Sequence, residues 1–207
     1  MTKAQIIVKA QLYLDDASEL STQEFSDLFD KMYRKVNSSR PWEGTKKQGA
    51  DTTSTSLQYV PLETDFLFLT QNANYTDSSE GASRPVVFRG TSYKEYEVVS
   101  WSDRRQYRNS DAHAWIDYPN LRLYFSKIPT VVETVEYDYH SQMPALATSA
   151  SPWFPAEYHD VIYHMMCADD FVIQQSDKAK SYKSENEKMA QDYLEEMAWW
   201  NSQLVQI

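Results

Sequence analysis

The densest group of metal-ligating and nucleophilic side chains in the sequence is His159, His164 and Cys167. The two histidines are five positions apart, which separates them by about 140° around a helix. A helical zinc site of the metalloprotease type needs histidines four apart with a glutamate between them, and His159-Asp-Val-Ile-Tyr-His164 has neither. His164 and Cys167 share a helical face, but no second cysteine exists to complete a tetrahedral set. We therefore expect no metal ion and no cofactor.

Other types of catalytic chemistry also lack their signatures. Cys167 has no activating local motif, and we expect its thiol to be buried and inert. The paired carboxylates Asp169-Asp170 and Glu195-Glu196 are adjacent in sequence and point in different directions, so we interpret them as charged surface. With 4 glycines in the whole chain, no phosphate-binding loop is evident. The sequence predicts no catalytic residues and a protein that is not an enzyme.

The one dense basic cluster consists of Arg104, Arg105 and Arg108, flanked by Trp101 and Trp115. Arginines interleaved with aromatic rings can bind a nucleic-acid backbone. A chain with a net charge of −10 is poorly suited to wrapping DNA, and aspartates lie close by in the sequence. We therefore favour salt bridges within a sheet or to a neighbouring acidic subunit, and we treat these five residues as a candidate interface.

Trp199 and Trp200 form a second candidate interface near the end of the sequence. Adjacent helical positions differ by about 100°, so the two rings face different directions. Trp200 continues an apolar stripe with Tyr193, Met197 and Leu204, which leaves Trp199 as the candidate contact residue. Either Trp200 is in the core and Trp199 meets a partner, or a neighbouring chain packs on both rings.

Composition sets the broad class of the protein. The chain has 207 residues, of which 42% are hydrophobic and 14% aromatic, as expected for one folded domain with an insertion. A single cysteine excludes an internal disulfide and suits a reducing cytosol. Residues 1–10 contain only a short apolar run, too brief for a signal peptide or a membrane span.

Helices are expected at both ends of the chain. Apolar spacing predicts a helix over residues 4–14, and the capping box Ser21-Thr-Gln-Glu24 begins a second helix over residues 22–38. After a Pro/Ala/Ser-rich connection over 141–155, a helical stripe extends to Ile173. A polar break over 174–181 and a long final helix follow, which together predict an αα-hairpin.

The middle of the chain reads as β-structure. Residues 44–56 are polar and aperiodic and are expected to form a loop, and 72–83 are expected to form a surface loop. Aromatic and branched runs lie between and after these loops, and 131–139 alternate between an apolar and a polar face. The predicted fold is α+β: a helical body from residues 1–43 and 141–207, with a central antiparallel β-rich insertion over 44–140, one domain overall.

Several segments in this order resemble the head-to-tail adaptor (head completion) proteins of tailed bacteriophages. The segments are L-Y-L-D-D-A-S-E-L-S-T-Q-E-F, S-S-R-P-W-E, Y-V-P-L-E-T-D-F-L-F-L, W-I-D-Y-P-N-L-R-L-Y-F-S-K-I-P and P-A-E-Y-H-D-V-I-Y-H. The similarity spans nearly the whole chain and depends on the order and spacing of these segments, since each alone is ordinary turn and strand chemistry.

The resemblance implies a structural subunit of the phage neck, assembled as a twelvefold ring. Its partners would be the portal protein, the tail tube, nozzle or other neck proteins, and further copies of itself. Packaged DNA would pass through the ring without sequence-specific binding, and no membrane would be involved. The protein would be made in the host cytoplasm and reside in the virion at the portal vertex.

Two alternative functions remain open. One is another structural role in a phage tail or baseplate. The other is a carbohydrate- or receptor-binding β module, in which Tyr93, Tyr96, Trp101 and Trp115 would be exposed for stacking on sugars.

Overall fold

The computed structural model describes residues 1–14, 20–70, 86–91 and 94–204. The loop predicted over 72–83 and the aromatic residue Tyr93 lie outside these residues. The chain divides into two compact units. Residues 1–44 and 143–207 form the helical unit, and residues 45–142 form the sheet unit.

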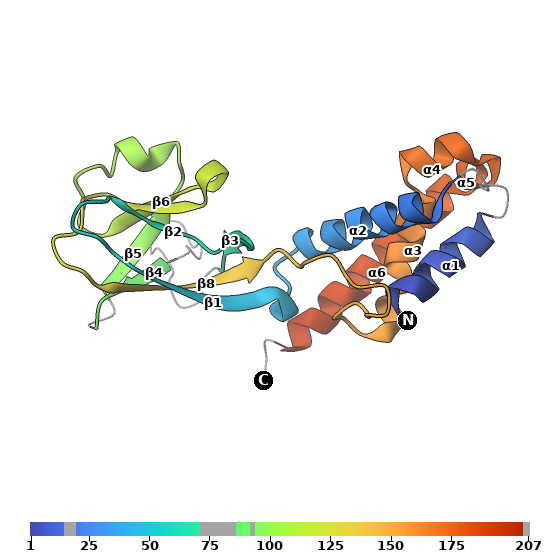
Figure 1. Ribbon diagram of the computed structural model, residues 1–207, viewed down its shortest axis with the longest axis horizontal. Coiled ribbons are helices and arrows are strands. Elements are labelled where there is room, and N and C mark those ends of the chain that lie inside the picture. Colours follow the sequence, from blue (N-terminus) through green and yellow to red (C-terminus); the bar gives the residue numbers. More distant parts are fainter. Residues whose placement is uncertain (15–19, 71–85, 92–93, 205–207) are drawn as a thin grey trace. The chain divides into compact units, whose positions relative to one another are not determined.

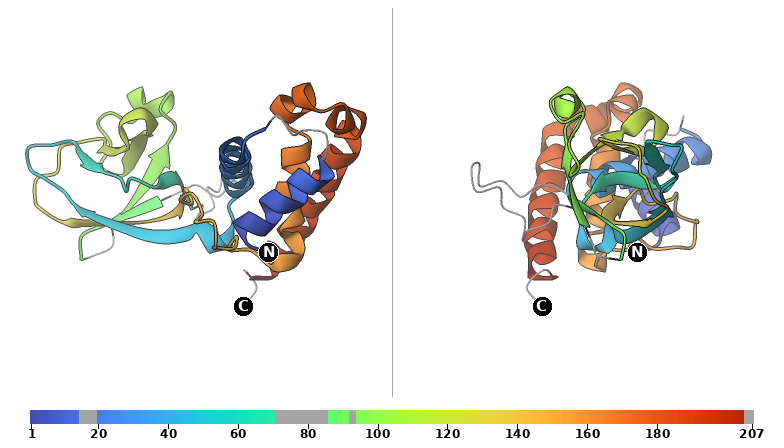
Figure 2. Two further views of the ribbon diagram at one scale, coloured as in Figure 1. Left: turned by 45° about the vertical axis from the view of Figure 1, so that its right-hand side comes forward. Right: turned by 90° about the vertical axis from the view of Figure 1, so that its left-hand side faces the viewer.

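The helical unit is built around α3, which contacts α1, α2 and α6 (Figure 1). Its α-helices are α1 (Lys3–Tyr13), α2 (Thr22–Ser38), α3 (Asp160–Cys167), α4 (Asp170–Gln175), α5 (Asp177–Ser181) and α6 (Lys183–Leu204). The short 3-10 turn η1 (Glu43–Thr45) lies where the first segment of this unit ends, at Gly44. Another short 3-10 turn, η4 (Ala156–Tyr158), comes just before α3. In Figure 2 the long α6 runs beside the shorter helices of its own unit.

The first two helices begin with capping boxes, because side chains satisfy amides that have no partner in the first turn. Thr2 and Gln5 cap α1, and Ser21 and Glu24 cap α2. The α2 prediction is confirmed, since Phe25, Leu28, Phe29, Met32 and Val36 are all buried on one face. These side chains join the core of the helical unit, which also takes in α1, α3 and α6.

The C-terminal helices differ from the predicted two-helix hairpin. The helix expected to reach Ile173 ends at Cys167, and α4 begins anew with Asp169 as its N-cap. The Asp169 carboxylate accepts a hydrogen bond from the amide of Phe171, which stabilises a helix start in the middle of an apolar stripe. The chain then turns through α4 and α5 before α6 packs on α3.

In the sheet unit, the described residues form eight strands in one sheet. The strands are β1 (Lys46–Thr52), β2 (Tyr59–Pro61), β3 (Phe66–Leu69), β4 (Val86–Arg89), β5 (Lys94–Val99), β6 (His113–Asp117), β7 (Arg122–Phe125) and β8 (Thr134–Ser141). Their order is β1-β8-β4-β5-β6-β7-β2, with β3 also pairing with β8. Strands β1 and β2, at the two ends of this order, approach each other, so the sheet nearly closes into a barrel. Pro61 lies in β2, where a missing N–H can be tolerated at a sheet edge.

The predicted fold class is wrong. The middle of the chain is a large mixed sheet with its own core of Val60, Leu123, Phe125, Val135 and Tyr137, among other residues, in place of an antiparallel insertion in a helical body. The sheet is mixed because β5 and β6 pair in parallel while the other pairs are antiparallel. A parallel pair needs a crossover connection, which residues 100–112 provide here.

The prediction of a loop over 44–56 is also wrong, because most of this segment forms β1. This polar strand pairs with β8 along its whole length, from Lys46 opposite His140 to Thr52 opposite Thr134. The alternation predicted for β8 is confirmed, with Val135 and Tyr137 buried and Thr134 exposed. A segment without alternating apolar residues can therefore form a strand when it pairs with a neighbouring strand that has them.

Among the helices that the structure describes, none combines the length and the apolar character needed to cross a membrane.

Candidate functional site

The basic cluster lies in the crossover between β5 and β6, residues 100–112, which we call the basic loop. At its start Ser100 donates a hydrogen bond to the Asp103 carboxylate, 2.7 Å, beside the 3-10 turn η2 (Asp103–Arg105). At its end the Tyr107 ring stacks on His113 with centroids 4.1 Å apart, and Ser126 donates hydrogen bonds to the carbonyls of Ser110 and His113. The contacts of Tyr107 and Ser110 therefore attach the end of the loop to β6 and to the residue that follows β7.

The three arginines of the basic loop have different environments. The guanidinium of Arg104 lies 4.0 Å from the centre of the Trp101 ring and donates a hydrogen bond to the Trp101 carbonyl. Arg105 and Arg108 are exposed, and neither has an ion pair among the residues that the structure describes. Trp101 keeps 46% of its surface exposed. As far as the described residues go, the loop therefore presents two cations without ion pairs beside a partly exposed ring.

An aromatic row supports this loop from the sheet. Tyr59 on β2 lies opposite Tyr124 on β7, which in turn lies opposite Trp115 on β6. Tyr124 and Trp115 stack nearly parallel, with centroids 6.4 Å apart and planes 5° apart, and Trp101 meets the edge of Tyr124 at 6.5 Å. Trp115 is buried, so it contributes to this row as a packed ring that contacts Tyr124.

The same burial bears on the sugar-binding alternative. Tyr96 and Trp115 are both buried, and Tyr96 belongs to the core of the sheet unit. Four aromatic residues were proposed for stacking on sugars. Among those of the four that the structure describes, Trp101 is the exposed one.

A second charged surface lies on α6. Helical spacing places Glu185, Asp192, Glu195 and Glu196 around one exposed face of this helix, and Trp199, 68% exposed, lies on the same face. We call these five residues the acidic stripe. One cation, Lys188, also lies on this face, so the face carries four negative charges and one positive charge. None of the four carboxylates takes part in an ion pair in the described part of the chain.

Trp200 faces the other way. Its ring lies 6.2 Å from Trp153 and 6.2 Å from Tyr158, and it packs against the core of the helical unit. Within one chain, therefore, Trp200 packs inward and Trp199 is exposed, and both the contact of Trp199 with a partner and the packing of a neighbouring chain on both rings stay predictions.

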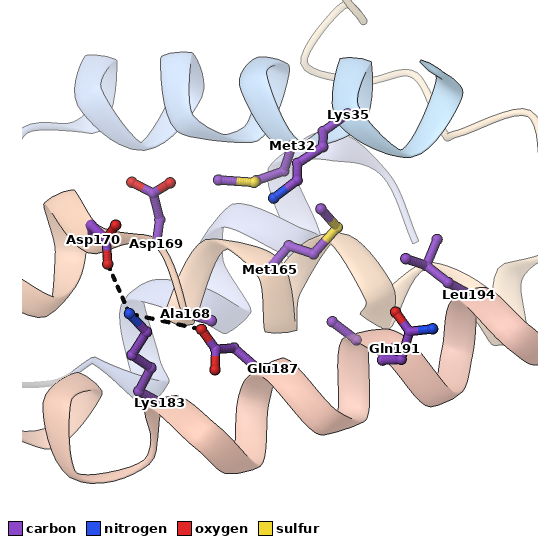
Figure 3. Close-up of a pocket in the computed structure, with 11 residues that line it drawn as sticks. Met32, Lys35, Met165, Ala168, Asp169, Asp170, Lys183, Glu187, Gln191 and Leu194 are labelled. Carbon is purple, nitrogen blue, oxygen red and sulfur yellow. Dashed lines mark hydrogen bonds and ion pairs between the residues drawn. The ribbon is translucent and has the colours of Figure 1, made fainter. Parts of the chain in front are cut away.

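A groove of about 330 Å³ lies between α2 and α6, over α3 (Figure 3). Met32, Met165 and Leu194 contribute its apolar surface. At one end Lys183 pairs with Asp170 at 2.8 Å and with Glu187 at 3.7 Å, as the dashed lines in Figure 3 show. Much of the charge at the rim of the groove is thus already paired within the protein.

The residues first considered for metal binding do not converge. His159 accepts a hydrogen bond from the Met1 amine at Nδ1, 2.7 Å, and donates from Nε2 to the Phe154 carbonyl, 2.9 Å. His164 instead bonds Asn186 at 2.8 Å. Burial raises the pKa of the Cys167 thiol to about 12, so this group is a poor nucleophile. No group of three or more His, Cys, Asp or Glu side chains suited to a metal ion occurs within the described residues.

Sequence reasoning missed one polar cluster, formed by Glu97, Ser110 and His113. Ser110 Oγ lies 2.5 Å from His113 Nδ1, and His113 Nε2 lies 3.7 Å from the Glu97 carboxylate. In acyl transfer the Ser110 hydroxyl would have to face a substrate. Here it accepts a hydrogen bond from the Ala112 amide within a tight turn. We therefore assign the cluster to anchoring the basic loop. Only the parallel pairing of Glu97 with His113 brings its members together, and no sequence spacing reveals that.

Comparison with known protein families bears on nearly the whole chain. Residues 1–206 match the family described as SU10 adaptor protein. No curated protein matches the chain significantly. The family match confirms the resemblance to phage head-to-tail adaptors. The chain therefore belongs to the SU10 adaptor protein family, a family of structural head-tail adaptors of bacteriophages.

Proposed function

We propose that this protein is a ring subunit of the phage neck, located between the portal vertex and the tail. Copies of the subunit extend the DNA channel and provide the surface to which the tail attaches. The observation that carries the proposal is the family match over residues 1–206, which includes both units.

The two charged surfaces support a role in assembly. A ring subunit makes heterologous contacts, in which two unlike faces of the same chain must match. The basic loop and the acidic stripe are unlike faces of this kind, and each carries an exposed tryptophan. Tryptophan and arginine are both enriched where protein interfaces gain most of their binding energy.

The charge distribution also suits a channel for DNA. The chain carries a net charge of −10, with 10 Asp and Glu against 4 Lys and Arg over residues 151–207. Like charge keeps DNA from adhering to a protein surface, so packaged DNA can move past it. In this function the protein binds portal, tail or neck proteins and further copies of itself, and it contacts DNA without reading its sequence.

The experiment is reconstitution with the portal protein of the same phage. The purified chain is mixed with portal rings, the complexes are separated by sedimentation, and the particles are imaged by cryo-electron microscopy. We expect a closed ring of this protein on the portal, with one copy for each portal subunit. Portal rings from an unrelated phage serve as the control. Failure to associate with its own portal under any tested condition would contradict the proposal.

A further inference from the structure

We propose that the basic loop of one copy docks on the acidic stripe of a neighbouring copy, and that this contact joins the subunits side by side. The inference rests on the proposed function, because it identifies the surfaces through which the ring would form. The partner is thus a second copy of this chain.

Charge is the first argument. Two copies that each carry a net charge of −10 repel each other, so a contact between them must bring opposite charges together locally. Arg105 and Arg108 are exposed cations without ion pairs in the described part of the chain, and the acidic stripe supplies carboxylates that also lack ion pairs there. Neither surface has to break an existing salt bridge to engage the other.

Preorganisation is the second argument. Arg104 already stacks on Trp101, and the aromatic row below holds that ring, so little side-chain freedom is lost when the loop binds. On the other surface Trp199 projects from a regular helix and is 68% exposed. Each surface therefore offers an aromatic anchor with an excess of charge of one sign around it, although exposed Lys188 lies on the acidic face and Asp103 lies in the basic loop.

Topology is the third argument. The basic loop belongs to the sheet unit and the acidic stripe to the helical unit. Every copy therefore has one surface of each kind, and contacts between them can propagate from copy to copy and close into a ring. DNA as the partner of the arginines is the competing outcome, but it would have to approach a strongly acidic protein.

A charge exchange between two variants tests the contact. The loop variant carries Arg105→Glu and Arg108→Glu, and the stripe variant carries Asp192→Lys, Glu195→Lys and Glu196→Lys. Each variant alone places like charges at both surfaces, which should weaken association between copies about a hundredfold or more. Mixed together, the two variants again have opposite charges at every contact. We expect the mixture to assemble in alternation, which an interaction within a single chain would not produce.

Assembly is measured in solution by sedimentation at high protein concentration and on portal rings by counting the copies bound. The control variant, Arg40→Glu with Lys46→Glu, makes the same change in net charge as the loop variant at exposed residues elsewhere, and it should assemble like the wild type. Thermal unfolding checks that each variant folds.

Three outcomes would overturn the inference: a loop variant that assembles normally, a mixture that assembles no better than its components, or a wild-type chain that never self-associates. A loop variant that loses DNA binding while still assembling would assign the arginines to DNA instead. Failure of the proposed function is distinguishable, because then the wild-type chain would not bind portal, whatever the charge exchange shows in solution.

Discussion

Arg104 and Arg105 are neighbours in the sequence, but their guanidinium groups have different environments. Arg104 is stacked on Trp101 and bonded to its carbonyl, while Arg105 is free in the described structure. The sequence identified the arginine cluster but could not tell which arginine is stacked and which is free. That difference depends on how the 3-10 turn orients successive side chains. Trp199 and Trp200 show the converse case, in which helical periodicity predicted that the two rings face different directions, and the structure shows Trp199 exposed and Trp200 packed against the core.

Cys167 gives a prediction at this scale. Burial raises its pKa to about 12, so almost none of the thiol is ionised near neutral pH, and the side chain is also inaccessible. We expect negligible reaction with a thiol reagent at mildly alkaline pH in the native protein, and stoichiometric reaction after denaturation. Absorbance of the released chromophore measures both. Rapid labelling of the folded protein would contradict the assignment.

His159 gives a second prediction. Its burial lowers the pKa of the imidazole, so the folded state favours the neutral ring. As pH falls below the ordinary histidine value of about 6.5, the unfolded chain gains a proton that the folded chain resists, and stability decreases. The thermal midpoint should therefore fall between about pH 7 and pH 5, and less steeply in His159→Gln. Equal pH dependence in the two proteins would exclude this residue as the cause.

At the scale of elements, β1 shows how a partner strand determines structure. Its sequence, Lys-Lys-Gln-Gly-Ala-Asp-Thr, contains almost no apolar residues, and the strand forms because β8 offers seven register positions for pairing. Gly49 lies close to the hydroxyl end of the Tyr137 ring, where an added Cβ would lie 2.5 Å from a ring carbon. The absence of a side chain here allows the two strands to accommodate that ring.

Gly49→Ala tests this close approach. Tyr137 is buried and packs against Phe66 and Tyr139, so its ring has little room to move away. We expect the free energy of unfolding to fall by about 1–3 kcal/mol, as for other overpacked sites. Chemical denaturation measures it. Ala50→Val, at the next and exposed position of the strand, is the matched control and should change stability by less than about 0.5 kcal/mol.

Over the whole molecule, the sheet unit is inserted in the sequence between the two segments of the helical unit. The sheet unit is one continuous segment, and its two ends are adjacent, because Lys46 pairs with His140 and Thr45 Oγ1 lies 2.9 Å from His140 Nδ1. Each unit has its own buried core. The charged surfaces proposed for assembly lie one on each unit.

Excision of the sheet unit tests its independence. We expect a fragment of residues 45–142 to fold cooperatively, since its ends meet and its core is internal. We also expect the helical unit to fold when a short Gly/Ser linker joins residues 44 and 143. Circular dichroism and amide-resolved NMR spectra report folding of each piece. A fragment that remains unfolded would show that its stability depends on the other unit.

Features that arise from local chemistry and periodicity can be read from the residues alone. These are the capped helix α2, the alternating strand β8, the divergence of Trp199 and Trp200 around α6, and the adaptor family. Four other features emerge from the folded chain: the polar strand β1, the parallel pair β5–β6, the anchoring cluster at His113 and the separation of Arg104 from Arg105. The physical reason is common to all four: each depends on contacts between segments or on local backbone orientation, which residue type and spacing do not encode.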